Sequence, residues 1–373
     1  MPRKAKSSAR KSAAAPKAAA PIDIDAACKL AATLLSAARL PVIAGMGADV
    51  AGARAAIRLA RATHGVYDHL ASAEIMAELE PLRRARRFAT TPDEARVRAD
   101  CLLFVGAGLV QRWPEIGARL AVGAPPALQR GRARKIVWLG GDRADVKGLG
   151  AEVDALAAAR RDMGPLIGMI RARAMGRPIK AEKSALRRID SLAETFKAAH
   201  FGVAISSAAA LDPLALEQLA GLVEDLNATT RFSSLLLGPR ANGAGVTQAG
   251  AWVAGFPPRT GFCSGEAEHD PWRFDARRLI ESGEADAALW IDAYGDEPPP
   301  WTRKVPLVTL TCGDFGGGLV HVRAGRPGVD HDCVEMAIET GVLTPRAASA
   351  PSAAPRVDAI IERIMAHLPG SCA

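Results

Sequence analysis

The stretch RLPVIAGMGADVAGARAAIRLARATHG, residues 39–65, joins an apolar run, a glycine-containing loop and an alanine-rich amphipathic segment. A short apolar run bounded by breakers predicts a buried strand, and the periodic segment after it predicts a helix. The same order occurs in HFGVAISSAAALDPLALEQLAGLVEDLNA, residues 200–228, where Asp212 and Pro213 form a predicted helix start. Strands that alternate with helices are typical of a parallel α/β sheet.

The rest of the chain continues this alternation. Apolar runs predict strands at 41–45, 101–108, 135–141, 201–206, 232–238, 285–293, 306–311 and 319–323. Amphipathic segments predict helices at 24–38, 50–63, 151–175, 182–199, 213–228, 272–283 and 355–368. The stretch NGAGVTQAGAWVAGFPP, residues 242–258, is rich in glycine and proline and is expected to be a loop.

Corresponding elements recur in the two halves. Each half contains a buried strand, a polar loop ending in Trp and Pro, and a second buried strand: 98–114 before 135–141, and 284–301 before 305–313. This order predicts two Rossmann-like lobes with mostly parallel sheets that face each other across a crevice. The predicted organisation is a tail at 1–21, lobes at 22–180 and 181–345, and a linker with a C-terminal helix at 346–373.

The net charge of +8 is concentrated at the start of the chain. Residues 1–21 contain six basic residues and no acid, so removing them reduces the net charge to +2. This Lys/Ala/Pro-rich tail is expected to be disordered, and the nearly neutral remainder argues against nucleic acid as a partner. Without a secretory signal or a run of about 18 apolar residues, a cytoplasmic protein that contacts no membrane is expected.

The sequence contains little that indicates catalysis by itself. GMGADVAG, residues 45–52, lacks the GxGxxG dinucleotide pattern, and neither GxSxG nor a Walker motif is present. Cys312, His321, His331 and Cys333 match no standard zinc spacing. Asp296 and Glu297 follow a predicted strand, but their proline-rich surroundings favour a solvated turn. The six cysteines form no CxxC pair and indicate free thiols.

One set of residues at fixed offsets resembles the B subunit of formylmethanofuran dehydrogenase, in the molybdopterin oxidoreductase superfamily. The motif residues are Asn242, Gly245, Gln248, Trp252, Gly255, Phe262, Gly265, Glu266 and Pro271. Similarity extends over about residues 22–345. It implies lobes of the formate dehydrogenase/DMSO reductase type and places the segment 242–258 beside the cofactor crevice and neighbouring subunits. In this setting Asn242 and Gln248 offer amide hydrogen bonds, and Trp252 is expected to be a buried anchor.

The sequence also departs from that family. The cysteine cluster that holds an iron–sulfur centre is missing, because residues 1–100 contain only Cys28. The family's metal-ligand position aligns with Glu74, in the expected loop 65–76, instead of a cysteine, which is the soft ligand such a metal uses. Glu268 replaces a family arginine that would suit pterin phosphates. These departures imply that molybdopterin, tungsten and an iron–sulfur cluster are all absent.

Such losses resemble the non-redox B subunits of formyltransferase/hydrolase complexes in aerobic methylotrophs. That resemblance implies a structural subunit, without a catalytic site of its own, in a complex that moves a formyl group from formyl-tetrahydromethanopterin to a methanofuran-like carrier and releases formate. The implied partners are a formyltransferase subunit, a zinc amidohydrolase-like subunit and a β-helical subunit. Two alternatives stay open at this point: an active molybdopterin or tungstopterin dehydrogenase subunit with Glu74 as metal ligand, and a separate nucleotide-binding module.

Overall fold

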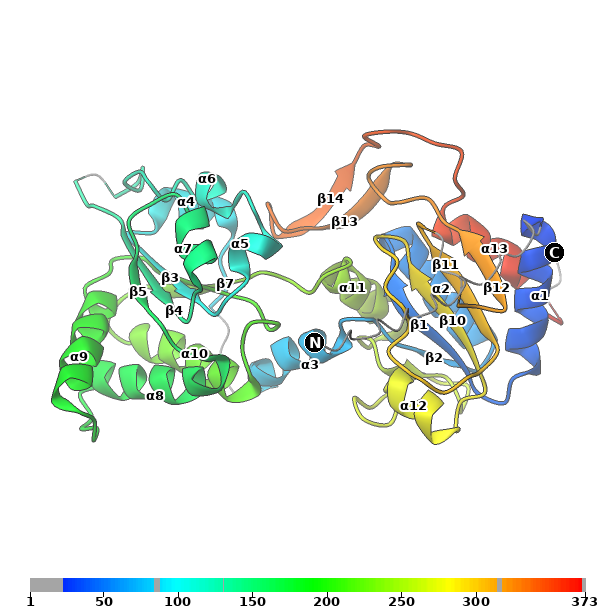
Figure 1. The fold of residues 1–373 in the computed structure, drawn as a ribbon, viewed down its shortest axis with the longest axis horizontal. Coiled ribbons are helices and arrows are strands. Elements are labelled where there is room, and N and C mark those ends of the chain that lie inside the picture. The colour runs from blue at the N-terminus through cyan, green and yellow to red at the C-terminus, as the bar shows by residue number, and fades with distance from the viewer. Residues whose placement is uncertain (1–22, 84–87, 130, 314–316, 371–373) are drawn as a thin grey trace, which may run out of the picture.

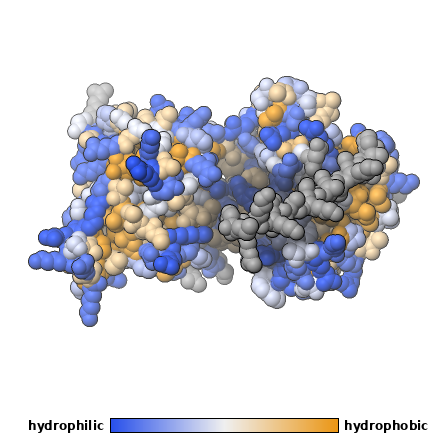
Figure 2. Space-filling view, viewed as in Figure 1, coloured by the Kyte–Doolittle hydropathy of each residue, from blue (hydrophilic) through white to orange (hydrophobic). Residues whose placement is uncertain are grey.

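The computed structural model describes residues 23–83, 88–129, 131–313 and 317–370. The predicted tail at 1–21 and Cys372 lie outside the described residues. Two α/β lobes lie side by side along the long axis of the molecule (Figure 1). In the space-filling view they form two masses joined by a narrower waist (Figure 2).

The first lobe is built on a seven-stranded sheet in the order β12-β11-β10-β1-β2-β8-β9. The pairs from β12 to β2 are parallel, whereas β8 and β9 are antiparallel. The strands are β1 (Pro41–Gly47), β2 (Val66–Tyr67), β8 (Thr260–Gly261), β9 (Glu268–His269), β10 (Ala287–Asp292), β11 (Leu307–Thr311) and β12 (Val320–Arg323).

Helices cover both faces of this sheet. Ile43 of β1 packs into the cluster with α1 (Ile24–Ala37), α2 (Val50–Ala62), α11 (Gly243–Ala254) and α13 (Val357–Ala366). Val42 and Ala44 point to the other face, into the cluster with α12 (Ala276–Ser282). Because both faces are covered, β1 is buried along its whole length, as its continuous apolar sequence requires.

The second lobe has a five-stranded, fully parallel sheet in the order β5-β4-β3-β6-β7. Its strands are β3 (Cys101–Val105), β4 (Lys135–Leu139), β5 (Asp154–Leu156), β6 (Gly202–Ser206) and β7 (Phe232–Leu236). The helices α8 (Met163–Ala174), α9 (Lys183–Lys197) and α10 (Pro213–Leu226) pack on one face. The other face is covered by α4 (Pro92–Arg98), α5 (Leu109–Arg112), α6 (Ile116–Arg119) and α7 (Arg143–Gly148), and short 3-10 turns occur at η1 (Glu80–Arg83) and η2 (Arg160–Asp162).

Two further elements connect the lobes. The chain leaves the first lobe after β2 and passes through the helix α3 (Ser72–Leu79) toward the second lobe. The antiparallel hairpin of β13 (Cys333–Ala337) and β14 (Val342–Arg346) reaches from the first lobe toward the second (Figure 1). At the hairpin tip, Ile338 packs against the core of the second lobe, and the Glu339 carbonyl accepts a hydrogen bond from Nε of Arg119 at 3.2 Å.

The predicted α/β class and all eight predicted strands are confirmed. Each predicted helical region also contains a helix, but the region 151–175 begins with β5, and α8 starts only at Met163. The segment 242–258 is not mainly a loop: α11 occupies 243–254. Likewise, much of the expected loop 65–76 is β2 and the start of α3. Helix α11 forms because its glycines are packed closely against neighbouring groups, which compensates for their low helix propensity.

The predicted lobe boundaries do not match the distribution of strands between the two sheets. The first lobe combines β1 and β2 with β8 to β12, whereas the second contains only β3 to β7. The division into 22–180 and 181–345 is therefore wrong, because the chain builds the whole second lobe as an insertion and then returns through α11. In addition, α13 is part of the first lobe, where it packs against α1 and α2. Within the residues that the structure describes, every helix is too short or too polar to span a bilayer.

Candidate functional site: the crevice between the lobes

A crevice of about 960 Å³ lies between the two lobes. In the first sheet the strand order reverses direction between β1 and β10, and in the second it reverses between β3 and β6. Ligands of open α/β sheets bind beyond the carboxyl ends of strands at such reversal points. Tyr294 after β10, Gly108 after β3 and Ser207 after β6 all line the crevice, so the reversal points of both lobes open onto one space.

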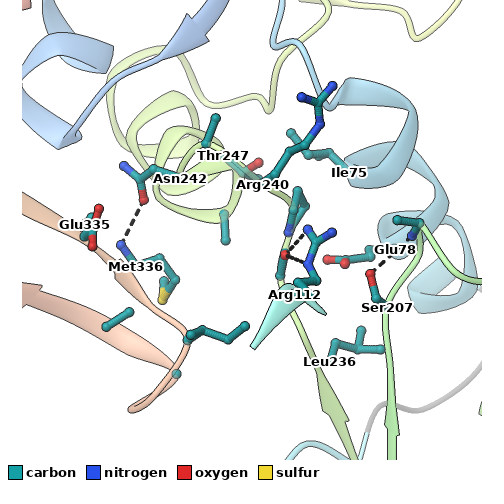
Figure 3. Close-up of a pocket in the computed structure, with 18 of the residues that line it drawn as sticks. Ile75, Glu78, Arg112, Ser207, Leu236, Arg240, Asn242, Thr247, Glu335 and Met336 are labelled. Carbon is teal, nitrogen blue, oxygen red and sulfur yellow. Dashed lines mark hydrogen bonds between the residues drawn. The ribbon is translucent and has the colours of Figure 1, made fainter. Parts of the chain in front are cut away.

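Helix α11 forms one wall, and Asn242 fixes its start. Asn242 has left-handed backbone geometry, with φ of 57°. Its Nδ2 donates to the Ala48 carbonyl at 2.9 Å, and its Oδ1 accepts from the Met336 amide at 2.9 Å (Figure 3). A single carboxamide therefore joins the β1–α2 loop, the start of α11 and the bridging hairpin. The side-chain amide of Asn242 therefore forms hydrogen bonds, as expected, and both of its partners are backbone groups of this chain.

The other motif residues divide between the crevice, the core and the surface. Gln248 lines the crevice, one turn and a half along α11 from Asn242. Trp252, near the end of the same helix, is 64% exposed in this chain. It is not buried within the chain itself, so an anchoring role for Trp252 requires a partner.

The remaining motif residues support local structure. Gly255 ends α11 with φ of 82°, and Gly265 has φ of 92° in an exposed turn. Phe262 is fully buried, with its ring 6.0 Å from that of Tyr67. Glu266 and Pro271 are exposed. None of these five lines the crevice among the described residues.

Glu74 lies on α3, next to Ile75 of the crevice lining, and it pairs with Arg112, an arginine of that lining which the sequence patterns do not single out. Its Oε2 is 3.0 Å from Nη2 of Arg112, and both side chains are largely buried. Arg112 also donates through Nε to the Gly238 carbonyl at 2.9 Å (Figure 3). The carboxylate of Glu74 thus neutralises a fixed cation. Its partner could not be found from sequence, because 38 residues separate the two.

The hairpin supplies a further charged group to the crevice. The Tyr294 hydroxyl donates to Oε2 of Glu335 at 2.7 Å. Burial first, and then the Glu335 carboxylate, raise the pKa of Tyr294, so this hydroxyl stays protonated and remains a donor. Arg346 pairs with both Glu335, at 2.5 Å, and Glu339, at 2.7 Å. One arginine thus pairs with both glutamates of the hairpin, which keeps a net charge of −1.

A buried polar pair, Asp68 and His69, holds the segment before α3. Nδ1 of His69 accepts from the Ala71 amide at 2.9 Å, so Nε2 carries the proton and donates to the Ala241 carbonyl at 3.1 Å. Burial lowers the pKa of His69 to about 4. Asp68 accepts from the Ser72 hydroxyl at 2.5 Å and from the Ala276 amide at 2.9 Å, and burial raises its pKa to about 6. Both ring nitrogens of His69 are used in backbone contacts, which makes its role structural.

Comparison with individual known proteins, and not with family models, shows the family to which this chain belongs. No protein-family model matches the chain. The B subunit of the formyltransferase/hydrolase complex Fhc from Methylorubrum extorquens is 38% identical over 274 residues, which is 72% of this chain and 72% of that protein. The chain belongs to this family of B subunits.

More distant relatives are B subunits of tungsten-containing formylmethanofuran dehydrogenase 2. The protein from Methanococcus maripaludis is 24% identical over 307 residues and that from Methanocaldococcus jannaschii 26% over 305, in each case covering 79% of this chain and 70% of the relative. The family resemblance inferred from the motif residues is confirmed.

The three-dimensional comparison agrees with this assignment. The X-ray structure of the formyltransferase/hydrolase complex FhcABCD from Methylorubrum extorquens, with methylofuran bound, contains a chain that superposes with a TM-score of 0.83 at 33% identity. The match covers 93% of this chain and 96% of that chain. The two-lobed architecture is therefore that of a subunit in a multi-subunit complex.

The residues present do not fit the tungsten centre that the dehydrogenase relatives imply. Tungsten and molybdenum in such sites take soft thiolate ligands, and no cysteine is among the described residues that line the crevice. The carboxylate of Glu74 is held by Arg112. Across the described part of the chain, no three His, Cys, Asp or Glu side chains are grouped to hold a metal ion.

The four residues considered for zinc have other partners or lie apart. Sγ of Cys312 accepts from Nη2 of Arg326 at 3.2 Å, and His321 contacts the Thr309 hydroxyl at 3.0 Å. His331 is bonded to backbone carbonyls, and Cys333 is buried in β13. Among the described residues these four side chains are not grouped as ligands of a metal ion.

Asp296 and Glu297 lie in a solvent-accessible turn, as predicted, since Asp296 is exposed and the Glu297 side chain is 41% exposed, but both carboxylates have partners. Oε1 of Glu297 accepts from Nη2 of Arg240 at 2.8 Å, and this hydrogen bond lowers the pKa of Glu297 against the opposing effect of burial. Asp296 accepts from the Gly313 amide at 2.8 Å. Both carboxylates are engaged, since the turn is packed beside the segment that leads into α11.

Proposed function

We propose that this chain is the non-redox B subunit of a formyltransferase/hydrolase complex. In that complex a formyl group moves from formyl-tetrahydromethanopterin to a methanofuran-like carrier, and water then releases it as formate. The role of this chain is to hold catalytic subunits together. It supplies no catalytic residue.

One observation carries this proposal: the whole two-lobed fold is retained while the position aligned with the metal ligand holds an ion-paired glutamate. The fold superposes on a chain of the FhcABCD complex over nearly its full length. Glu74, however, is paired with Arg112, and the lining described for the crevice offers no thiolate. A retained scaffold without the donor set of its redox relatives supports a structural role.

The proposed partners are a formyltransferase subunit, a zinc amidohydrolase-like subunit and a β-helical subunit, in the cytoplasm. Support for docking comes from exposed aromatic side chains on the first lobe, including Trp252 at 64% and Trp272 at 72% exposure. Large aromatic side chains are enriched where subunits meet, and they contribute strongly to affinity when buried there. The absence of molybdopterin, tungsten and an iron–sulfur cluster from this chain is part of the same proposal.

The first experiment is to tag the chain in its native host, isolate it under mild conditions, and identify the co-eluting polypeptides by mass spectrometry. An untagged strain serves as the control. A formyltransferase and an amidohydrolase recovered in equal amounts would support the proposal. Recovery of the chain alone, or with an electron-carrier protein, would contradict it.

A second measurement separates the structural role from the redox alternative. Metal analysis of the isolated complex is expected to give tungsten and molybdenum far below one atom for each copy of this chain. One atom of either metal per copy, together with dye-linked oxidation of a formyl carrier that is lost on Glu74→Ala, would establish the dehydrogenase alternative and reject this proposal.

A further inference from the structure

The chain crosses between the two lobes at two places that lie beside each other. The first crossing leaves β2 and passes through α3, and the second runs from β7 through residues 237–242 into α11. Glu74 lies on the first crossing and Arg240 on the second. Nε of Arg240 is 4.0 Å from Oε1 of Glu74.

Each of these two residues is bound on its far side to a different lobe. Oε2 of Glu74 pairs at 3.0 Å with Arg112 of α5, which directly follows β3 in the second lobe. Arg240 pairs through both guanidinium nitrogens with Glu297 of the first lobe, at 2.8 Å for Nη2 and Oε1. The four side chains therefore form one continuous series, Arg112–Glu74–Arg240–Glu297.

The Glu297 end of this series is fixed to β10 of the first sheet, and the Arg112 end is bonded to the second crossing, two residues after β7. The Glu297 amide donates to Oδ2 of Asp292, the last residue of β10, at 3.0 Å, and the Glu297 carbonyl accepts from Nε1 of Trp290 at 2.7 Å. At the other end, Nε of Arg112 donates to the Gly238 carbonyl at 2.9 Å. The series thus runs between the reversal points of the two sheets.

The charges in the series balance, and its Arg112–Glu74 end is shielded from water. Two glutamates alternate with two arginines, and the side chains of Glu74 and Arg112 are only 17% and 16% exposed. Arg240 and Glu297 are more exposed, at 47% and 41%. Removal of one member of a shielded ion pair leaves the other charge unpaired, which is costly where solvent screening is reduced. Glu74 is the most sensitive member, because it contacts an arginine on each side and is more shielded from water than Arg240.

We propose that Glu74 is a positioning residue that locks the two lobes at a fixed separation through the Arg112–Glu74–Arg240–Glu297 series. At the position aligned with the metal ligand of the redox relatives, the carboxylate of Glu74 thus joins the two crossings between the lobes. This inference goes beyond the proposed function, because it concerns the geometry of the chain and not its partners or its reaction.

Hydrogen exchange followed by mass spectrometry tests the lock, using the full-length chain in the assembly in which it purifies. The variant is Glu74→Gln, which preserves the shape of the side chain and removes its charge. Amide exchange is expected to become about tenfold faster or more in both crossings, residues 72–79 and 237–242, since local opening exposes both together. The radius of gyration from X-ray scattering is expected to increase.

A matched control separates the lock from a general effect of losing a carboxylate. Glu284 pairs with Arg278 at 2.5 Å within the first lobe, so Glu284→Gln is expected to leave both crossings unchanged. The conservative variant Arg112→Lys retains the positive charge. Its amide exchange rates in the two crossings are expected to lie between those of the wild type and those of Glu74→Gln. If Glu74→Gln does not fold, Glu297→Gln breaks the series at its more exposed end and is expected to speed exchange in 237–242.

Three outcomes would overturn the proposal. The first is exchange in both crossings equal to that of the Glu284→Gln control. The second is faster exchange confined to 72–79, which would show a local role for Glu74 within α3 alone. The third is additive effects of Glu74→Gln and Arg240→Gln on exchange in 237–242, which would show that these two residues are not coupled.

Discussion

Asn242 and Gly245 lie on the same turn of α11, and a Cβ atom at position 245 would stand 2.3 Å from Oδ1 of Asn242. That oxygen accepts the Met336 amide of the bridging hairpin. The glycine therefore leaves room for a carboxamide that joins the first lobe, α11 and the hairpin. This relationship explains physically why both residues belong to the family motif.

Gly245→Ala is expected to destabilise the chain by about 1–2 kcal/mol, because the methyl group displaces the Asn242 carboxamide from two hydrogen bonds and outweighs the gain in helix propensity. Asn242→Ala is expected to cost about 2–3 kcal/mol, since alanine is also disfavoured at φ of 57°. Chemical denaturation measures both. If the two losses were additive in the double variant, the proposed contact between the residues would be wrong.

Trp252→Ala is expected to leave folding stability within about 0.5 kcal/mol, as is usual for an exposed side chain. The substitution should instead weaken binding to the partner subunits, because loss of a central aromatic anchor typically costs about 2 kcal/mol or more of binding free energy. Co-purification of the partner polypeptides and the melting temperature of the isolated chain are the two measurements. Leu128→Ala, at a 66% exposed position on the second lobe, is the control. A normal complex with a much lower melting temperature would instead place Trp252 in the fold of this chain.

Tyr294→Phe is expected to release the hairpin from the first lobe by removing the hydrogen bond to Glu335. A hydrogen bond to a charged group contributes about 1.5–3 kcal/mol. Hydrogen exchange should therefore accelerate in residues 333–346. The control is Tyr67→Phe, which removes a hydroxyl that donates to the Phe256 carbonyl at 2.8 Å within the first lobe. Equal acceleration of the hairpin in both variants would contradict the assigned contact.

His69 gives stability a pH dependence of known sign. Its pKa is lowered from 6.5 to about 4 in the folded state, so its stabilising contribution is complete above pH 6.5 and is lost as the pH falls toward 4. The shift corresponds to about 3 kcal/mol. Asp68 acts in the opposite sense: its pKa is raised from 3.8 to about 6, so its contribution is complete below pH 3.8 and is lost as the pH rises toward 6.

The two effects overlap between pH 4 and 6, and a variant is needed to separate them. In His69→Gln the loss of stability between pH 6.5 and 4 should be smaller than in the wild type by about 3 kcal/mol. Unfolding free energies measured across this range test the difference. Parallel curves for wild type and variant would show that His69 does not titrate as inferred.

Much of the secondary structure followed from local patterns. The run PVIAG at 41–45 and the apolar core of 285–293 are too continuous for surface strands, and both proved to be central strands buried on two faces. The helix start at Asp212 was also visible, because Asp212 accepts from the Ala215 amide at 2.8 Å as an N-cap does. Family membership could be inferred too, since motif residues at fixed offsets are a property of sequence.

Helix α11 shows where local patterns misled. Its glycines suggested a loop, yet Gly243, Gly245 and Gly250 lie where a Cβ atom would meet neighbouring groups at 2.3–2.8 Å. Close packing selected glycine at these positions, and tertiary contacts determined the helix. Propensity describes an isolated segment and contains no information about the space around it.

The sequence by itself determined the α/β class, the central strands and the presence of a single cysteine, Cys28, in residues 1–100, because composition, periodicity and residue identity are local properties. Only the tertiary structure decided which strands share a sheet, that the second lobe is inserted into the first, and that Glu74 meets Arg112 and Arg240. These facts depend on contacts between residues far apart in the chain. Such contacts are set by the packing of whole elements, which the periodicity of any single segment does not encode.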